Sequence, residues 1–196
     1  MTPHVILWDL MDTLVRDPFF THMPGFFGLS LDALVAQKHP TAWRDFELGR
    51  IDEDELYARF FRDARPIDGP GLKRHMGEGY AWLDGMEGLL RDMQARGVPM
   101  HALSNYPPWV EVCDARLGLS RYLSLRFVSF RTGTRKPAAE AYLGACQALG
   151  VAPDACLFID DREVNCEGAR AVGMPALRFT GDALALREQL RTHGLG

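Results

Sequence analysis

Short apolar runs that end in polar residues recur along the chain. The first, Val5-Ile6-Leu7-Trp8, has the length and composition of a buried strand and stops at Asp9. Four more apolar runs predict strands, at residues 98–103, 125–130, 156–159 and 175–179. Helical patterns separate these runs: one ends at Leu117, and the others cover residues 86–96, 137–149 (with Pro137 as the first helical residue), 164–172 and 182–192. This alternation predicts an α/β fold with a doubly wound parallel sheet.

The first strand is followed by a long stretch that shows only helical patterns. Four helices are expected there, over residues 30–39, 41–49, 52–61 and 71–83. Ser30 and Thr41 occupy N-cap positions, and the acidic residues 52–55 suit the first turn of a helix. We therefore expect residues 1–15 and 85–196 to form the core domain and residues 16–84 to form an inserted helical cap.

Composition narrows the class of protein. The formal net charge of -4 argues against general binding to nucleic acid. No apolar run reaches the roughly 18 residues that a membrane span needs, and a strand that begins at Val5 leaves no room for a targeting peptide. The four cysteines form no C-x-x-C pair, which argues against zinc and fits reduced thiols. We expect a cytoplasmic protein, monomer or weak homodimer, with no nucleic-acid or membrane partner.

The informative polar residues follow the predicted strands. Asp9, Ser104 and the pair Asp160-Asp161 come directly after three of them, and Lys136 follows the loop after a fourth. Because the carboxyl ends of parallel strands share one edge of a sheet, these groups can converge. Three carboxylates repel one another unless a cation lies between them, and oxygen ligands beside phosphate suit Mg²⁺. Lysine and serine supply donors for phosphate oxygens. The pattern predicts a magnesium site that takes a small phosphorylated metabolite.

In order and spacing, these residues resemble the four motifs of the haloacid dehalogenase superfamily. The matching segments are Asp9-Leu10-Met11-Asp12-Thr13, Ser104-Asn105, Arg135-Lys136-Pro137, and Phe158-Ile159-Asp160-Asp161-Arg162 with Asn165. The helical insert is similar to the C1-type cap of that superfamily, and the core to its Rossmann-like domain. The resemblance implies a Mg²⁺-dependent phosphohydrolase in which Asp9 attacks phosphorus and forms an aspartyl-phosphate that water hydrolyses.

The resemblance also implies a role for each matching residue. Ser104 and Lys136 hold the transferring phosphoryl group, and Lys136 keeps Asp9 ionised. Asp161 binds Mg²⁺ directly, whereas Asp160 acts through a metal-bound water. The remaining expected positions are Leu10, Met11, Asn105, Phe19 and Phe20 for substrate contact, Met11 also for the metal, and Thr13 and Asn165 for support, with Asn165 orienting the acidic pair.

Met11 departs from the superfamily pattern. Phosphatases of the superfamily carry an aspartate two residues after the nucleophile as general acid and base, and methionine cannot transfer a proton. Such proton transfer is worth roughly 10²- to 10⁴-fold in rate. Three explanations stay open: Asp12 reaches the site, a cap residue such as Asp17 or His22 donates the proton, or the leaving group needs little protonation.

A finer resemblance bears on the substrate. Residues 9–19, 38–41, 51–53 and 105–109 are similar to a branch of plant plastid proteins described as flavin mononucleotide hydrolases, in which the methionine is also present. This implies flavin mononucleotide (FMN) as substrate, and the aromatic segment from Phe19 to Phe27 would suit a flavin ring. Two alternatives remain. A dehalogenase fits Met11 but works without metal, leaving Asp160 and Asp161 unexplained. A phosphate- or nucleotide-sensing protein would keep the fold without turnover.

Overall fold

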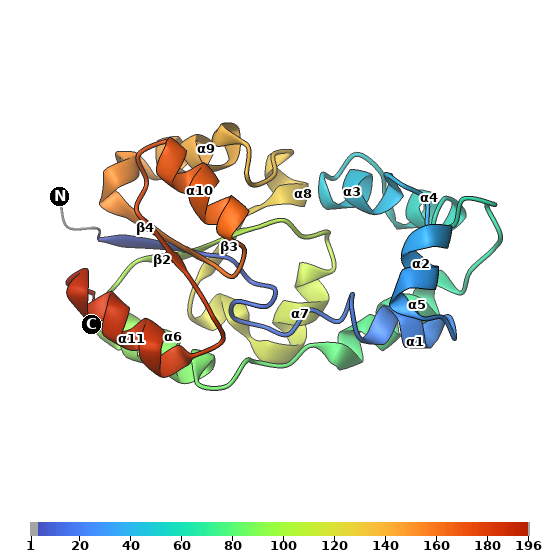
Figure 1. Cartoon of the computed structure of the whole chain (residues 1–196), viewed down its shortest axis with the longest axis horizontal. Coiled ribbons are helices and arrows are strands. Elements are labelled where there is room, and N and C mark those ends of the chain that lie inside the picture. The colour runs from blue at the N-terminus through green and yellow to red at the C-terminus, as the bar shows by residue number, and fades with distance from the viewer. Residues whose placement is uncertain (1–3, 196) are drawn as a thin grey trace.

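The computed structural model describes residues 4–195 and has one five-stranded sheet in which all strands are parallel (Figure 1). The strands are β1 (Val5–Trp8), β2 (Met100–Ser104), β3 (Ser124–Val128), β4 (Cys156–Asp160) and β5 (Ala176–Arg178). Their order is β3-β2-β1-β4-β5, so β1 lies at the centre. The order reverses beside β1, as in a doubly wound fold, which confirms the predicted fold class.

Helices cover both faces of the sheet (Figure 1). One face packs against α9 (Ala139–Leu149) and α10 (Glu163–Ala171), and the other against α6 (Met86–Ala95), α7 (Val110–Leu117) and α11 (Ala183–Thr192). The side chains of β1 alternate between the two cores: Leu7 joins the first cluster, and Ile6 and Trp8 join the second. Burial on both faces explains why this strand is apolar throughout.

Five helices are inserted between β1 and α6, beyond the carboxyl end of the sheet (Figure 1). They are α1 (His22–Phe26), α2 (Leu31–Gln37), α3 (Ala42–Glu47), α4 (Glu53–Ala58) and α5 (Gly69–Gly79). The Ser30 hydroxyl accepts the Ala33 N–H at 3.2 Å, as an N-cap should. Asp52 and Glu55 form a reciprocal capping box at the start of α4.

The structure corrects several expected boundaries in the insert. Helix α4 ends at Ala58, so Phe60 and Phe61 lie after it, where Phe27 packs on their rings at centroid distances of 5.0 and 4.9 Å. Helix α5 ends at Gly79 rather than Leu83, and α1 was not among the four expected helices. The Thr41 hydroxyl donates to the Asp45 carboxylate at 2.9 Å instead of capping the backbone of α3.

Two boundaries in the core also differ from expectation. Pro137 precedes α9 by two residues, within a turn closed by the Ala138 N–H on the Arg135 carbonyl at 3.0 Å, so it is not the first helical residue. Strand β3 ends at Val128, and the next residues form the short helix α8 (Ser129–Thr132). Between residues 4 and 195, no helix combines the length and apolar character that a membrane span requires.

Candidate active site

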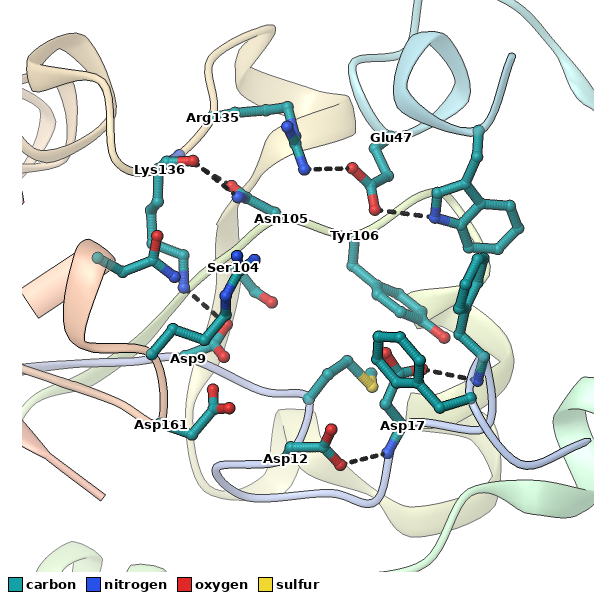
Figure 2. A pocket seen from close by; sticks show the side chains of 16 residues that line it. Asp9, Asp12, Asp17, Glu47, Ser104, Asn105, Tyr106, Arg135, Lys136 and Asp161 are labelled. Carbon is teal, nitrogen blue, oxygen red and sulfur yellow. Dashed lines mark hydrogen bonds and ion pairs between the residues drawn. The ribbon is translucent and has the colours of Figure 1, made fainter. Parts of the chain in front are cut away.

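The pairing of the central strands brings the first polar residues together. Trp8 is level with Ala102 on β2 and with Ile159 on β4, and the Asp9 N–H donates to the Ile159 carbonyl at 2.9 Å. The residues that follow at these three strand ends therefore lie side by side. Figure 2 shows Asp9, Ser104 and Asp161 around one end of a cavity, with Lys136 above Asp9.

Lys136 lies between two buried carboxylates. Its ammonium donates to Asp9 Oδ1 at 2.7 Å and to Asp160 Oδ2 at 2.6 Å. Burial alone would lower the pKa of Lys136, but the attraction of Asp9 and Asp160 outweighs it and the pKa is raised. The pKa of Asp9 is also raised, first because burial disfavours its charge and also because Asp160 and Asp161 repel it, in opposition to Lys136. Lys136 therefore remains an ammonium, and the cluster favours a further cation.

The two adjacent aspartates of β4 have different surroundings. The Asp160 oxygens accept four hydrogen bonds, from the Arg162 N–H, from Lys136 and, at each oxygen, from the Asn165 amide at 3.0–3.1 Å. Asp160 is fully buried, whereas Asp161 is partly exposed and lines the cavity. The Thr13 hydroxyl accepts the Asp161 N–H at 3.0 Å and lies 3.5 Å from carboxylate oxygens of Asp9 and Asp161. Asp161 is thus free to bind a ligand, and Asp160 orients Lys136.

The carboxylates of Asp9, Asp160 and Asp161 also form a possible metal centre. Each offers an oxygen within 4.8 Å of the others. Within this cluster, one ammonium opposes three carboxylates, so two negative charges are uncompensated. An oxygen-only set with this charge deficit fits Mg²⁺, which binds through one or two carboxylates and keeps water ligands for substrate phosphate.

Ser104 and Asn105 complete this end of the cavity. Ser104 Oγ is buried yet has no hydrogen-bond partner among residues 4–195, and Ser104 lines the cavity. A buried hydroxyl without a partner is costly, which indicates that a ligand oxygen satisfies it. The Asn105 side chain donates to the Lys136 carbonyl and accepts the Lys136 N–H, both at 2.9 Å. Asn105 therefore fixes the backbone from which Lys136 reaches Asp9.

The cavity has a volume of about 500 Å³ and lies between the sheet and the insert. Its other walls come from the insert, where Phe19, Phe20 and Trp43 form an aromatic corner. The Phe19 ring lies 5.0 Å from the Trp43 ring and 5.2 Å from the Phe20 ring, measured between centroids. Of the segment from Phe19 to Phe27, whose suitability for a flavin ring stays a prediction, Phe19 and Phe20 line the cavity, whereas Phe27 packs on Phe60 and Phe61.

Five lining residues of the cavity were not among the predicted site residues: Trp43, Glu47, Tyr106, Arg135 and Arg162. Three of these contact one another. The Trp43 indole donates to Glu47 Oε1 at 2.9 Å, and Arg135 Nη2 lies 2.8 Å from Glu47 Oε2 (Figure 2). Burial raises the pKa of Glu47 although Arg135 and Trp43 oppose the rise. This ion pair joins α3 of the insert to the loop before α9. In the sequence, Trp43 and Glu47 lie in a predicted helix, and nothing signalled that Glu47 faces Arg135.

The structure places the other predicted residues as follows. Met11, Asp12, Asp17 and Asn165 line the cavity. Leu10 and Thr13 are fully buried beneath it, so Leu10 could contact a ligand only through its backbone. Within the described chain, His22 is not among the lining residues; it bonds to Thr21 and packs on the His75 ring at 5.8 Å. His22 therefore lies outside the cavity wall, whereas Asp17 is part of it.

Comparison of the sequence and the fold with known proteins identifies the family. The sequence profile of haloacid dehalogenase-like hydrolases matches residues 4–173, and the chain belongs to this family. It is 47% identical over 182 residues to flavin mononucleotide hydrolase 1, chloroplastic, of Arabidopsis thaliana, covering 92% of this chain and 74% of that protein.

A solved structure of a HAD family enzyme of Bacteroides thetaiotaomicron matches with a TM-score of 0.74 at 19% identity, covering 95% of this chain and 99% of that one. The same enzyme was solved in complex with magnesium and inorganic phosphate, and that structure matches with a TM-score of 0.69 at 20% identity over 94% and 98% of the two chains. At this identity the likeness supports the fold.

Proposed function

We propose that this chain is a Mg²⁺-dependent phosphatase that hydrolyses FMN to riboflavin and inorganic phosphate. The observation that carries the proposal is the position of the Lys136 ammonium, 2.7 Å from Asp9 and at one end of a cavity whose opposite wall is aromatic. A phosphate ester with a planar ring would place its phosphoryl group beside Asp9 and its ring beside the aromatic corner. The relative that is 47% identical to this chain is named flavin mononucleotide hydrolase 1.

The chain's residues divide the chemistry between them. The Asp9 carboxylate attacks phosphorus, and the ester oxygen leaves as an aspartyl-phosphate forms. Lys136 and the Ser104 hydroxyl hold the phosphoryl oxygens, and Asn105 keeps Lys136 in position. Water then attacks the aspartyl-phosphate and releases inorganic phosphate.

Mg²⁺, when bound, supplies the positive charge that lets an anionic ester approach these carboxylates. Asp9 and Asp161 would hold the ion, and Asp160, whose oxygens already accept four hydrogen bonds, would add its negative charge to the site. Of Met11, only the backbone carbonyl would suit the ion, because a thioether is a poor ligand for Mg²⁺. Thr13 and Asn165 orient the acidic residues through the contacts described above.

FMN hydrolysis is tested by incubating the purified protein with FMN and Mg²⁺ and measuring riboflavin and phosphate release. We expect turnover that depends on Mg²⁺ and exceeds that of small aliphatic phosphates such as phosphoglycolate. The Asp9→Asn variant supplies the background. Release no greater than this background, together with turnover of another ester, would contradict FMN as substrate and leave the phosphatase class intact.

Replacing Trp43 with Ala is expected to lower kcat/KM for FMN by about 10- to 100-fold, because stacking of a base-like ring on an aromatic side chain is worth about 1–3 kcal/mol. Phosphoglycolate has no ring to stack, so its kcat/KM should change little. Trp43→Phe should recover part of the loss, since it keeps a ring but loses the indole N–H that bonds to Glu47. Trp82→Ala is the control, because Trp82 packs on Tyr122 outside the cavity. Equal losses on both substrates would argue against a ring site.

Met11 favours one alternative function, a sensor that binds phosphate or a nucleotide without turnover. BeF₃⁻ and AlF₄⁻ mimic the phosphoryl group and would bind beside Asp9 in either case, so only product release separates the two. A dehalogenase is disfavoured because halide chemistry leaves the three-carboxylate cluster without a purpose.

The division of the chain into a core of residues 1–15 and 85–196 and a cap of residues 16–84 is part of the same proposal. The ion pair between Glu47 and Arg135 joins the two parts at the cavity. The cytoplasmic location and the monomer or weak homodimer remain predictions.

A further inference from the structure

Phosphate ester hydrolysis needs a proton donor, and the cavity contains one group suited to that role. This inference rests on the proposed phosphatase function. When the P–O bond to an alcohol breaks, the alkoxide needs a proton, and the water that attacks the aspartyl-phosphate must lose one. Met11 lines the cavity at the position where phosphatases of the family carry an acid. Its thioether can neither give a proton to the alkoxide nor take one from the water. Another group on the cavity wall has to exchange this proton.

Five carboxyl groups line the cavity, from Asp9, Asp12, Asp17, Glu47 and Asp161. Three of them have other roles: Asp9 is bonded to Lys136, Glu47 is bonded to Arg135 and Trp43, and Asp161 is available to the metal in the acidic cluster. Asp12 is exposed, has a left-handed backbone with φ of 56°, and its Oδ1 accepts the Asp17 N–H at 3.0 Å. Asp12 therefore orients the segment that carries Asp17.

Asp17 differs from the other four. It is half-buried in the segment that leads from the nucleophile loop into α1, on the insert side of the cavity (Figure 2). Its Oδ1 accepts the Phe19 N–H at 2.9 Å. The cavity's cations lie elsewhere: Lys136 and Arg135 pair with other acids, and Arg162 follows β4. A carboxyl group that is half-buried without an ion-pair partner is suited to hold a proton.

The groups that act on Asp17 from the surrounding elements are neutral or acidic. Asp12 and Asp9 come from the loop after β1, and Glu47 comes from α3. Tyr80 lies at the end of α5, Tyr106 in the segment after β2, and Cys113 in α7. The hydroxyls of the two tyrosines bond to each other at 2.9 Å. Burial, followed by repulsion from Asp12, Glu47 and Asp9, raises the pKa of Asp17 to about 7, although the Phe19 N–H opposes the rise. This value lies in the range that suits an acid and base near neutral pH.

We infer that Asp17 is the general acid and base of the hydrolysis and has the role that Met11 cannot fill. As the Asp9–phosphorus bond forms and the bond to the ester oxygen breaks, the Asp17 carboxyl gives its proton to that oxygen and becomes a carboxylate. The neutral alcohol then leaves. In the second half, the Asp17 carboxylate takes a proton from the water that attacks phosphorus, the Asp9–phosphorus bond breaks, and phosphate leaves with the acid restored.

The test compares two esters that differ in their need for a proton, FMN or another alkyl phosphate and p-nitrophenyl phosphate, whose anion leaves unaided. The measured quantity is kcat/KM, which ends at alcohol release and excludes the later hydrolysis step. Asp17→Asn should lower kcat/KM for the alkyl ester by about 100-fold or more and for the aryl ester by less than about 10-fold. Asp12→Asn is the matched comparison: it keeps the oxygen that accepts the Asp17 N–H, so it should change the alkyl-to-aryl ratio far less than Asp17→Asn does. Asp32→Asn, at an exposed position in α2, is the control without effect.

Equal losses on the two esters in Asp17→Asn, or a selective alkyl loss in Asp12→Asn instead, would overturn the assignment. The wild-type protein provides a second measurement that needs no variant. The alkyl-to-aryl ratio of kcat/KM should fall as pH rises through about 7, since Asp17 must be protonated to act and shared ionisations cancel in the ratio; a flat ratio overturns the inference. A protein that hydrolyses esters other than FMN contradicts only the substrate, because the same test applies to those esters. A protein that hydrolyses none contradicts both.

Discussion

Asp9→Asn is expected to reduce phosphate ester hydrolysis on the order of 10⁴-fold or more, since loss of a covalent nucleophile removes the whole reaction path. An amide oxygen does not form the aspartyl-phosphate. The measurement is phosphate release with Mg²⁺, together with trapping of the phosphorylated protein in the wild type. Turnover retained within 10-fold would show that the nucleophile lies elsewhere.

The same substitution should make the metal-free protein more stable. Asp9 is buried beside Asp160 and Asp161, and asparagine keeps an oxygen for Lys136 without the repelling charge. The raised pKa of Asp9 means that the folded protein holds this proton more tightly than the unfolded chain does. Ionisation of Asp9 therefore lowers the free energy of unfolding of the wild type as pH rises through the raised pKa. The gain in Tm of Asp9→Asn over the wild type should be larger at pH 8 than at pH 6. Asp32→Asn is the control at an exposed site. A lower Tm at pH 8 would contradict this account of the cluster.

Lys136→Met is expected to destabilise the protein by about 3–5 kcal/mol, because it leaves Asp9 and Asp160 buried without their shared cation. For a chain of this size, that corresponds to a fall in Tm of about 6–20 °C. Activity should be lost as well, since no ammonium remains to hold the phosphoryl group. Thermal unfolding without Mg²⁺ measures the first effect and phosphate release the second.

Two conditions should recover part of this stability. At lower pH the unpaired carboxyl groups become protonated, so the deficit of the variant shrinks. Added Mg²⁺ supplies a replacement cation, and binding to the folded state alone raises Tm with concentration. Lys73→Met is the matched control, because Lys73 pairs with Glu53 at 2.5 Å with both side chains about one-third exposed, and such pairs contribute about 1 kcal/mol or less. A deficit no larger than that of the control would contradict a buried charged cluster.

The parts of the insert that depend on local hydrogen bonds could be predicted from the sequence, and the parts that depend on packing between distant residues could not. The Ser30 cap and the acidic start of α4 follow from contacts within three residues, which the sequence contains in full. The end of α4 does not, because Phe60 and Phe61 pack on Phe27, far away in the chain, and that packing outweighs their helical spacing. Pro137 likewise suits a helix start in isolation, yet a turn closed by the Arg135 carbonyl precedes α9.

By itself the sequence determined the sheet, the insertion after the first strand, and the meeting of Asp9, Ser104, Lys136 and Asp161 at one edge. It could do so because parallel strands place all their carboxyl ends together, so position after a strand implies position in space. Only the tertiary structure decided which acid is free and which is occupied: Asp160 accepts four hydrogen bonds from three groups, Glu47 is paired with Arg135, and Asp17 pairs with no cation among residues 4–195. The surroundings of Glu47 and Asp17 depend on how the insert lies against the core, and those of Asp160 depend on side-chain packing within the core. No periodicity or spacing along the chain records either arrangement.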